Sequence, residues 1–98
     1  MSPVNRTSHA AYDLKYHFVW IPKYRMMILT EAIAERVEEI FREVAEIYEF
    51  EIQTMVVVVE DHVHIFLSAP PKYAPGQIVR ILKSRSAKAV FKEFPEVR

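Results

Sequence analysis

The sequence has no cysteine and a single glycine among its 98 residues, and both absences exclude kinds of chemistry. Without cysteine there can be no disulfide, no zinc–thiolate site and no cysteine nucleophile. With only Gly76, a glycine-rich phosphate loop cannot form. No apolar run approaches the ~20 residues that span a bilayer, and the first ten residues lack the apolar segment of a signal peptide. We therefore expect a cytoplasmic protein without a membrane partner.

The chain length predicts one domain, and an apolar content of 51% is enough for a modest hydrophobic core. Residues 1–10 are mostly polar, include Pro3 and show no hydrophobic period. We expect them to form a flexible tail, and we expect residues 11–98 to form the domain.

Charges of opposite sign are segregated along the chain, although its formal net charge is zero. Residues 31–51 carry eight glutamates against two arginines, whereas residues 72–92 carry six basic residues and no acid. Lys15, Lys23 and Arg25 form a second basic group. The pattern indicates an acidic and a basic face, and the basic one suits a polyanion. A solvated helix face explains it equally well.

Hydrophobic periodicity predicts three strands and two helices. Residues 11–21 alternate as a strand with one aromatic face, and an apolar stripe with Thr30 as N-cap predicts a helix over about 30–48. That stripe consists of Ile33, Val37, Ile40, Val44 and Ile47. The aromatic face of the strand consists of Tyr12, Leu14, Tyr16, Phe18 and Trp20.

The second half of the chain predicts a hairpin followed by a helix. Residues 50–59 are β-branched and nearly all apolar, which is typical of a central strand covered on both faces, at least in its second half. Glu60-Asp61 predicts a tight turn to an antiparallel strand over 62–69. Residues 69–74 form a linker, Pro75 begins the second helix and Pro95 ends it. The polar side of that helix is expected to carry Lys83, Ser84, Arg85, Ser86 and Lys88.

The resulting order is β-α-β-β-α, which is one strand short of the ferredoxin-like pattern. We expect an α+β fold with an antiparallel sheet and both helices on one face. The other face of the sheet is then exposed, covered by a ligand or buried against a partner.

His62 and His64 are the candidate metal ligands. Residues i and i+2 of a strand share a face, so their imidazoles should project side by side. Two neutral imidazoles on a rigid surface suit a divalent metal. Alternatively they are two surface histidines of a half-exposed strand. Asp61 either assists the metal or only forms the turn, and His17 is expected to be structural or to face the polyanion rather than to be a metal ligand.

The loop after the first strand holds Lys23, Tyr24 and Arg25, two cations around an aromatic ring. This combination can bind a phosphate and stack a base, and it can equally be an ordinary exposed turn.

Four segments together resemble the small single-tyrosine transposases with a histidine-hydrophobic-histidine motif, of the insertion-sequence 200/605 type. They are the strand YHFVWIPKYR, the amphipathic helix after it, the hairpin segment DHVHIFLS and the basic helix VRILKSRSAKAVFKEFP. The segments follow the family's order and spacing and cover most of residues 12–95.

The resemblance implies a ferredoxin-like dimer that binds a hairpin of single-stranded DNA. It implies that His62 and His64 hold Mg²⁺ or Mn²⁺, that the ion polarises the scissile phosphate, and that a tyrosine attacks to leave a 5′-phosphotyrosine link. Candidate DNA contacts are Lys23, Tyr24, Arg25, Lys83 and Arg85, with Lys15 less firmly placed.

The sequence departs from the family pattern at the catalytic tyrosine. In the family this residue lies on a further helix, beyond the position that corresponds to Arg98. None of the five tyrosines in the sequence matches it. We therefore expect that the 98-residue polypeptide is a truncated transposase and does not cleave DNA alone. Two alternatives are a fragment that binds DNA hairpins without cutting them and a metal-free ferredoxin-like dimerisation module.

Overall fold

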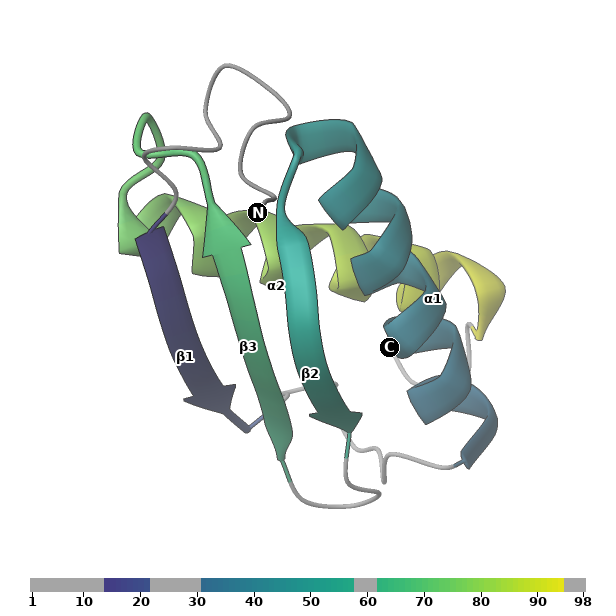
Figure 1. Cartoon of the computed structure of the whole chain (residues 1–98). Helices are drawn as coiled ribbons and strands as arrows, with labels where there is room; N and C mark the ends of the chain where they lie inside the picture. Colours follow the sequence, from purple (N-terminus) through teal and green to yellow (C-terminus); the bar gives the residue numbers. More distant parts are fainter. Residues whose placement is uncertain (1–13, 22–30, 58–61, 95–98) are drawn as a thin grey trace.

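The computed structural model describes residues 14–21, 31–57 and 62–94. In chain order they form β1 (Leu14–Trp20), α1 (Glu31–Tyr48), β2 (Glu51–Val57), β3 (Val63–Ala69) and α2 (Pro75–Glu93). This is the predicted β-α-β-β-α order, and both helices cover one face of the antiparallel sheet (Figure 1). The predicted α+β fold is confirmed. The expected tail, the loop after β1, the hairpin turn and Pro95 lie outside the described residues.

The strand order is β1-β3-β2, so β3 is the central strand and β2 lies at an edge. The prediction that residues 50–59 form a central strand with both faces covered is therefore wrong for the described part of that range. Val56 is 51% exposed on the face away from the helices, whereas Val63 in β3 is 1% exposed. β3 pairs with β1 on one side and with β2 on the other. The core-facing residues of β3 are therefore more deeply buried than those of β2, although β2 is rich in apolar residues.

A β-bulge at Gln53 explains why β2 does not alternate simply. The pairing with β3 shifts between Ile52 and Thr54, which leaves Gln53 as an extra residue. The shift brings Met55 and Val57 onto the same face as Ile52, where all three pack against the core. Gln53 Nε2 donates a hydrogen bond of 3.1 Å to the hydroxyl of Ser68, a buried residue in the central strand.

The hydrophobic core lies between the sheet and the helices. The ring of Phe41 is fully buried and meets the ring of Trp20 edge-on, with centroids 5.8 Å apart. The predicted aromatic face of β1 is thus confirmed for its described aromatic residues, although Leu14 is 47% exposed. Ile47 was placed on the apolar stripe of α1 but is 64% exposed. The buried stripe drifts with the 3.6-residue period toward Tyr48, which leaves Ile47 outside it.

The buried side of α2 consists of Ile78, Leu82, Ser86 and Val90, at successive intervals of four residues. Ser86 was expected on the polar side, and this expectation is wrong. Its hydroxyl donates to the carbonyl oxygen of Lys83 at 3.1 Å, so a small polar residue occupies the core without an unsatisfied donor. At the start of the helix Pro75 takes its predicted place, and the Gln77 side chain accepts a hydrogen bond of 2.8 Å from the Ala74 N–H.

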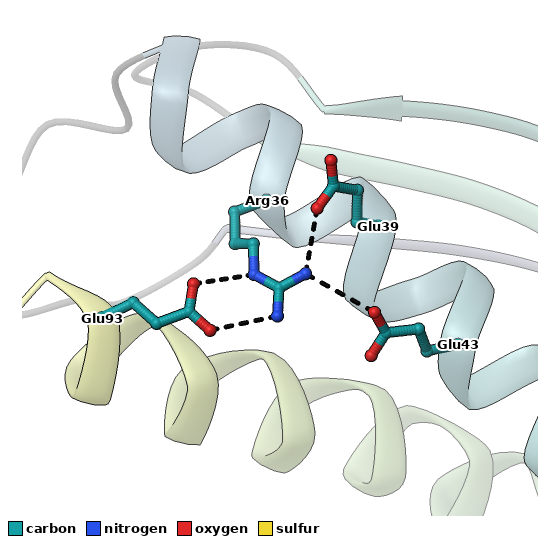
Figure 2. A network of polar contacts seen from close by, with 4 residues as sticks. All are labelled: Arg36, Glu39, Glu43 and Glu93. Atoms are coloured by element: carbon teal, nitrogen blue, oxygen red, sulfur yellow. Dashed lines mark hydrogen bonds and ion pairs between the residues drawn. The ribbon is translucent and has the colours of Figure 1, made fainter.

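An ionic cluster joins the two helices on their outer side (Figure 2). Arg36 of α1 contacts Glu93 of α2 and also two carboxylates of its own helix, Glu39 and Glu43. The hydrogen bonds from Arg36 hold the pKa of Glu93 below its ordinary value. The hydrogen bonds to Glu93 and Glu39, together with the charge of Glu43, raise the pKa of Arg36.

Neither described helix is long and apolar enough to cross a membrane.

Candidate metal and DNA site

The face of the sheet away from the helices carries a cluster of histidines. Alternation in β3 directs Val63, Ile65 and Leu67 into the core and leaves His64 on this open face. His62 immediately precedes the strand, and its ring centroid lies 5.2 Å from that of His64, with planes 60° apart. Both residues are half-buried. The expected side-by-side placement of the two rings is therefore present, and neither ring is sealed in apolar packing.

A third histidine joins the cluster from the neighbouring strand. The register of β1 against β3 pairs His17 with Phe66 and Val19 with His64, so His17 lies diagonally across from His64. His17 Nε2 is 3.1 Å from His64 Nδ1, within hydrogen-bond distance. Sequence reasoning did not find this contact, since it depends on the register between two strands far apart in the chain. The only signal in the sequence was that alternation places His17 and His64 on the face of their strands that points away from the core.

The donor set fits part of a divalent-metal site. His62 and His64 offer two imidazoles, a ligand type that suits Mn²⁺ better than Mg²⁺. Among the residues that the structure describes, no group of three or more histidines, cysteines or carboxylates could hold a metal ion. A metal bound here would therefore need further ligands such as water or phosphate oxygens. Asp61, a possible assistant from the sequence, lies outside the described residues.

Two of the candidates for DNA contact, Lys83 and Arg85, lie on α2, on the opposite side of the sheet from the histidines. Lys83 Nζ is 5.9 Å from the centroid of the Trp20 ring. Arg85 donates a hydrogen bond of 2.9 Å from Nη2 to the Tyr48 hydroxyl, and its guanidinium lies 5.5 Å from that ring. Both residues are exposed. The structure therefore separates them from the histidine cluster.

Lys15 is a basic residue on the open face itself, two positions along β1 from His17. Its Nζ donates a hydrogen bond of 3.4 Å to the Ser68 hydroxyl, and the residue is exposed. The remaining DNA candidates, Lys23, Tyr24 and Arg25, lie outside the described residues.

The described tyrosines do not lie on the open face with the histidines. Tyr16 faces the helices from β1 and stacks on Phe18 with centroids 5.5 Å apart. Tyr48 and Tyr73 pack against the core, with their centroids 6.0 Å apart. Within the described part of the chain, no tyrosine is therefore placed to attack a phosphate held at His62 and His64.

Comparison with known proteins identifies the family. A family model described as "Transposase IS200 like" matches residues 10–98, nearly the whole chain. The chain belongs to the IS200-like transposase family. It is 38% identical over 87 residues to the ISDra2 transposase TnpA of Deinococcus radiodurans, and 28% identical over 91 residues to the transposase of insertion sequence IS200 from Salmonella typhimurium.

A solved structure supports the same assignment for this IS200-like chain. The fold matches a crystal structure of a candidate transposase from Deinococcus radiodurans R1 with a TM-score of 0.74 and 34% identity, over 87% of this chain and 65% of that one. The match to TnpA spans 89% of this IS200-like chain but only 61% of TnpA. The match to the Salmonella protein spans 93% of this chain but only 59% of that protein. It therefore spans about three fifths of the length of these relatives.

Proposed function

We propose that this chain is the histidine-bearing core of a transposase that cuts and rejoins single-stranded DNA, with Mg²⁺ or Mn²⁺ held by His62 and His64. The observation that carries the proposal is the adjacency of these two rings on the open face of the sheet, within a chain of the IS200-like transposase family.

The chemistry that a metal would supply there is Lewis-acid polarisation of the scissile phosphate, which makes the phosphorus more electrophilic. The chain's own contribution is to hold His64 on the central strand β3 and His62 directly before that strand. That strand is paired on both sides, so the ligands need little reorganisation. Attack by a tyrosine would keep the phosphoester energy in a covalent 5′-phosphotyrosine link, and rejoining would then need no nucleotide cofactor. Such a tyrosine has to come from outside the described residues.

The ligand assignment is tested by titrating Mn²⁺ into the wild-type chain and into His64→Ala, with the free ion followed by electron paramagnetic resonance. Binding should be lost or strongly weakened in His64→Ala, because alanine supplies no ligand. Ser84→Ala, an exposed change on α2, is the matched control and should bind as the wild type does. Equal Mn²⁺ affinity in wild type and His64→Ala would contradict the assignment.

A hairpin-binding chain that does not cut is the second candidate function. The placement of Tyr16, Tyr48 and Tyr73 away from the histidines favours it for the described residues. In either case the partners we propose are a hairpin of single-stranded DNA and a second copy of the chain. Analytical ultracentrifugation of the chain with and without a hairpin oligonucleotide tests both partners. A monomer at all concentrations, with no shift on adding DNA, would contradict them.

A further inference from the structure

His17 and His64 are held next to one another by the sheet. β1 and β3 pair antiparallel, and both imidazoles stand on the open face at diagonal positions of the ladder. Their ring centroids are 4.9 Å apart with planes at 62°, and the Phe66 ring meets His17 edge-on at 6.1 Å. His17 is therefore restricted by its strand, by an aromatic neighbour and by the contact with His64.

The hydrogen bond between His17 Nε2 and His64 Nδ1 admits two arrangements of protons when both rings are neutral. If His17 donates, His64 carries its proton on Nε2 and has no nitrogen lone pair left for a metal. If His64 donates from Nδ1, its Nε2 lone pair is free, and His17 carries its own proton on Nδ1. Only the second arrangement allows neutral His64 to be a metal ligand through Nε2.

We propose that His17 is a positioning residue, which accepts a hydrogen bond from His64 Nδ1–H and so fixes the tautomer of His64 that presents Nε2 to a metal. The proposal rests on the proposed function for its purpose, but the tautomer itself is a property of the metal-free chain. Partners that accept the second ring proton of a metal-bound histidine commonly set its tautomer and orientation, and their loss typically weakens metal binding by about 10- to 100-fold.

The first test reads the tautomer without any metal. Two-bond ¹H–¹⁵N spectra of the neutral imidazoles, assigned with His17→Phe and His64→Ala, distinguish a protonated Nδ1 from a protonated Nε2. We expect His64 to carry its proton on Nδ1 in the wild type and to lose this preference in His17→Phe, which keeps an aromatic ring beside Phe66 but removes the acceptor. A wild-type His64 with its proton on Nε2 would overturn the proposal.

The second test measures Mn²⁺ affinity. His17→Phe should bind Mn²⁺ about 10-fold or more weakly. His17→Gln should recover most of the loss, because its amide oxygen can accept from His64 Nδ1–H. Ser84→Ala, an exposed change on α2, should bind as the wild type does, and circular dichroism should show all variants folded. Unchanged affinity in a folded His17→Phe would overturn the proposal.

Two further outcomes separate this proposal from its alternatives. Electron spin-echo spectroscopy of bound Mn²⁺ should detect two coordinated imidazole nitrogens. Three in the wild type and two in His17→Gln would make His17 a ligand and overturn its positioning role. If the wild type binds no Mn²⁺ at all, the proposed metal function fails, and the ¹⁵N spectrum alone decides whether His17 fixes the tautomer of His64.

Discussion

Arg36 holds Glu93 by two parallel hydrogen bonds across 57 positions of the chain, from Nε to Oε1 at 2.7 Å and from Nη2 to Oε2 at 3.0 Å. This bidentate pair connects α1 to the last turn of α2, as Figure 2 shows. Both side chains are partly open to solvent, so screening by water and salt limits what the pair contributes to stability.

The pair predicts a dependence of stability on acid pH. Hydrogen bonds from Arg36 lower the pKa of Glu93 below its ordinary value of 4.5, so the unfolded chain binds a proton at this site more readily. The stabilisation is complete above that ordinary value and is lost as pH falls through the lower pKa of the folded state. Urea unfolding between neutral and acid pH should therefore show a smaller acid loss in Glu93→Gln than in the wild type. Glu46→Gln, at another exposed glutamate, is the control, and an identical acid loss in all three proteins would contradict the prediction.

The contact between Phe41 and Trp20 predicts a large loss of stability when it is removed. Phe41 is fully buried, and truncation of such a ring to alanine typically lowers the free energy of unfolding by about 3–5 kcal/mol. Ile47→Ala on the same helix should change it by less than about 0.5 kcal/mol, because Ile47 is 64% exposed. Urea denaturation of both variants measures the difference. Similar losses would mean that the core is not centred on this ring.

The exposed cations of α2 predict a change in the salt dependence of DNA binding. If Lys83 and Arg85 each neutralise a phosphate, Lys83→Gln and Arg85→Gln should weaken hairpin binding, and each should reduce the slope of log K against log salt by about 0.7–0.9. Arg42→Gln, an exposed arginine of the acidic helix α1, should leave both quantities unchanged. Fluorescence anisotropy over a range of salt concentrations gives the slopes. Equal slopes in all four proteins would remove these two residues from the DNA surface.

The family resemblance, which matches none of the five tyrosines to the catalytic one, and the placement of Tyr16, Tyr48 and Tyr73 away from the histidines together predict that the 98-residue chain does not nick DNA. A 3′-labelled single-stranded hairpin incubated with the chain and Mn²⁺ should remain intact, and no labelled protein–DNA adduct should survive denaturing electrophoresis. Cleavage that persists in the triple variant Tyr16→Phe, Tyr48→Phe and Tyr73→Phe would point to a nucleophile among the residues outside the described ranges. Cleavage abolished by one of those changes would contradict the placement argued from the structure.

Most elements of the fold could be predicted from the sequence, because each depends on local periodicity or on a single punctuating residue. The alternation over residues 11–21, the helical stripe from Ile33 to Val44 and the start of α2 at Pro75 are all of this kind. The central position of β3 depends on pairing between distant segments. The apolar run in β2 indicated burial of a strand but could not say which strand would have neighbours on both sides.

The candidate site divides in the same way. The side-by-side placement of His62 and His64 follows from a two-residue period and could be predicted, whereas the contact of His17 with His64 follows from the register of β1 against β3 and could not. Ser86 was assigned to the wrong side of α2 because its polarity was given more weight than its helical spacing from Leu82 and Val90. Whether the histidines bind metal and whether the α2 cations bind DNA remain predictions.

His64 pairs with Val19 of β1 on one side and with Val56 of β2 on the other. The position of this candidate metal ligand therefore depends on the register of all three strands. A slip of β3 by one residue against its neighbours would turn the His64 imidazole into the hydrophobic interior and expose Val63 and Ile65 to water. A sheet with this misaligned register would lose both the burial of its apolar side chains and the outward position of its candidate metal ligand. The histidine geometry is therefore protected by the same energy that selects the native pairing, and it should persist until the domain itself unfolds.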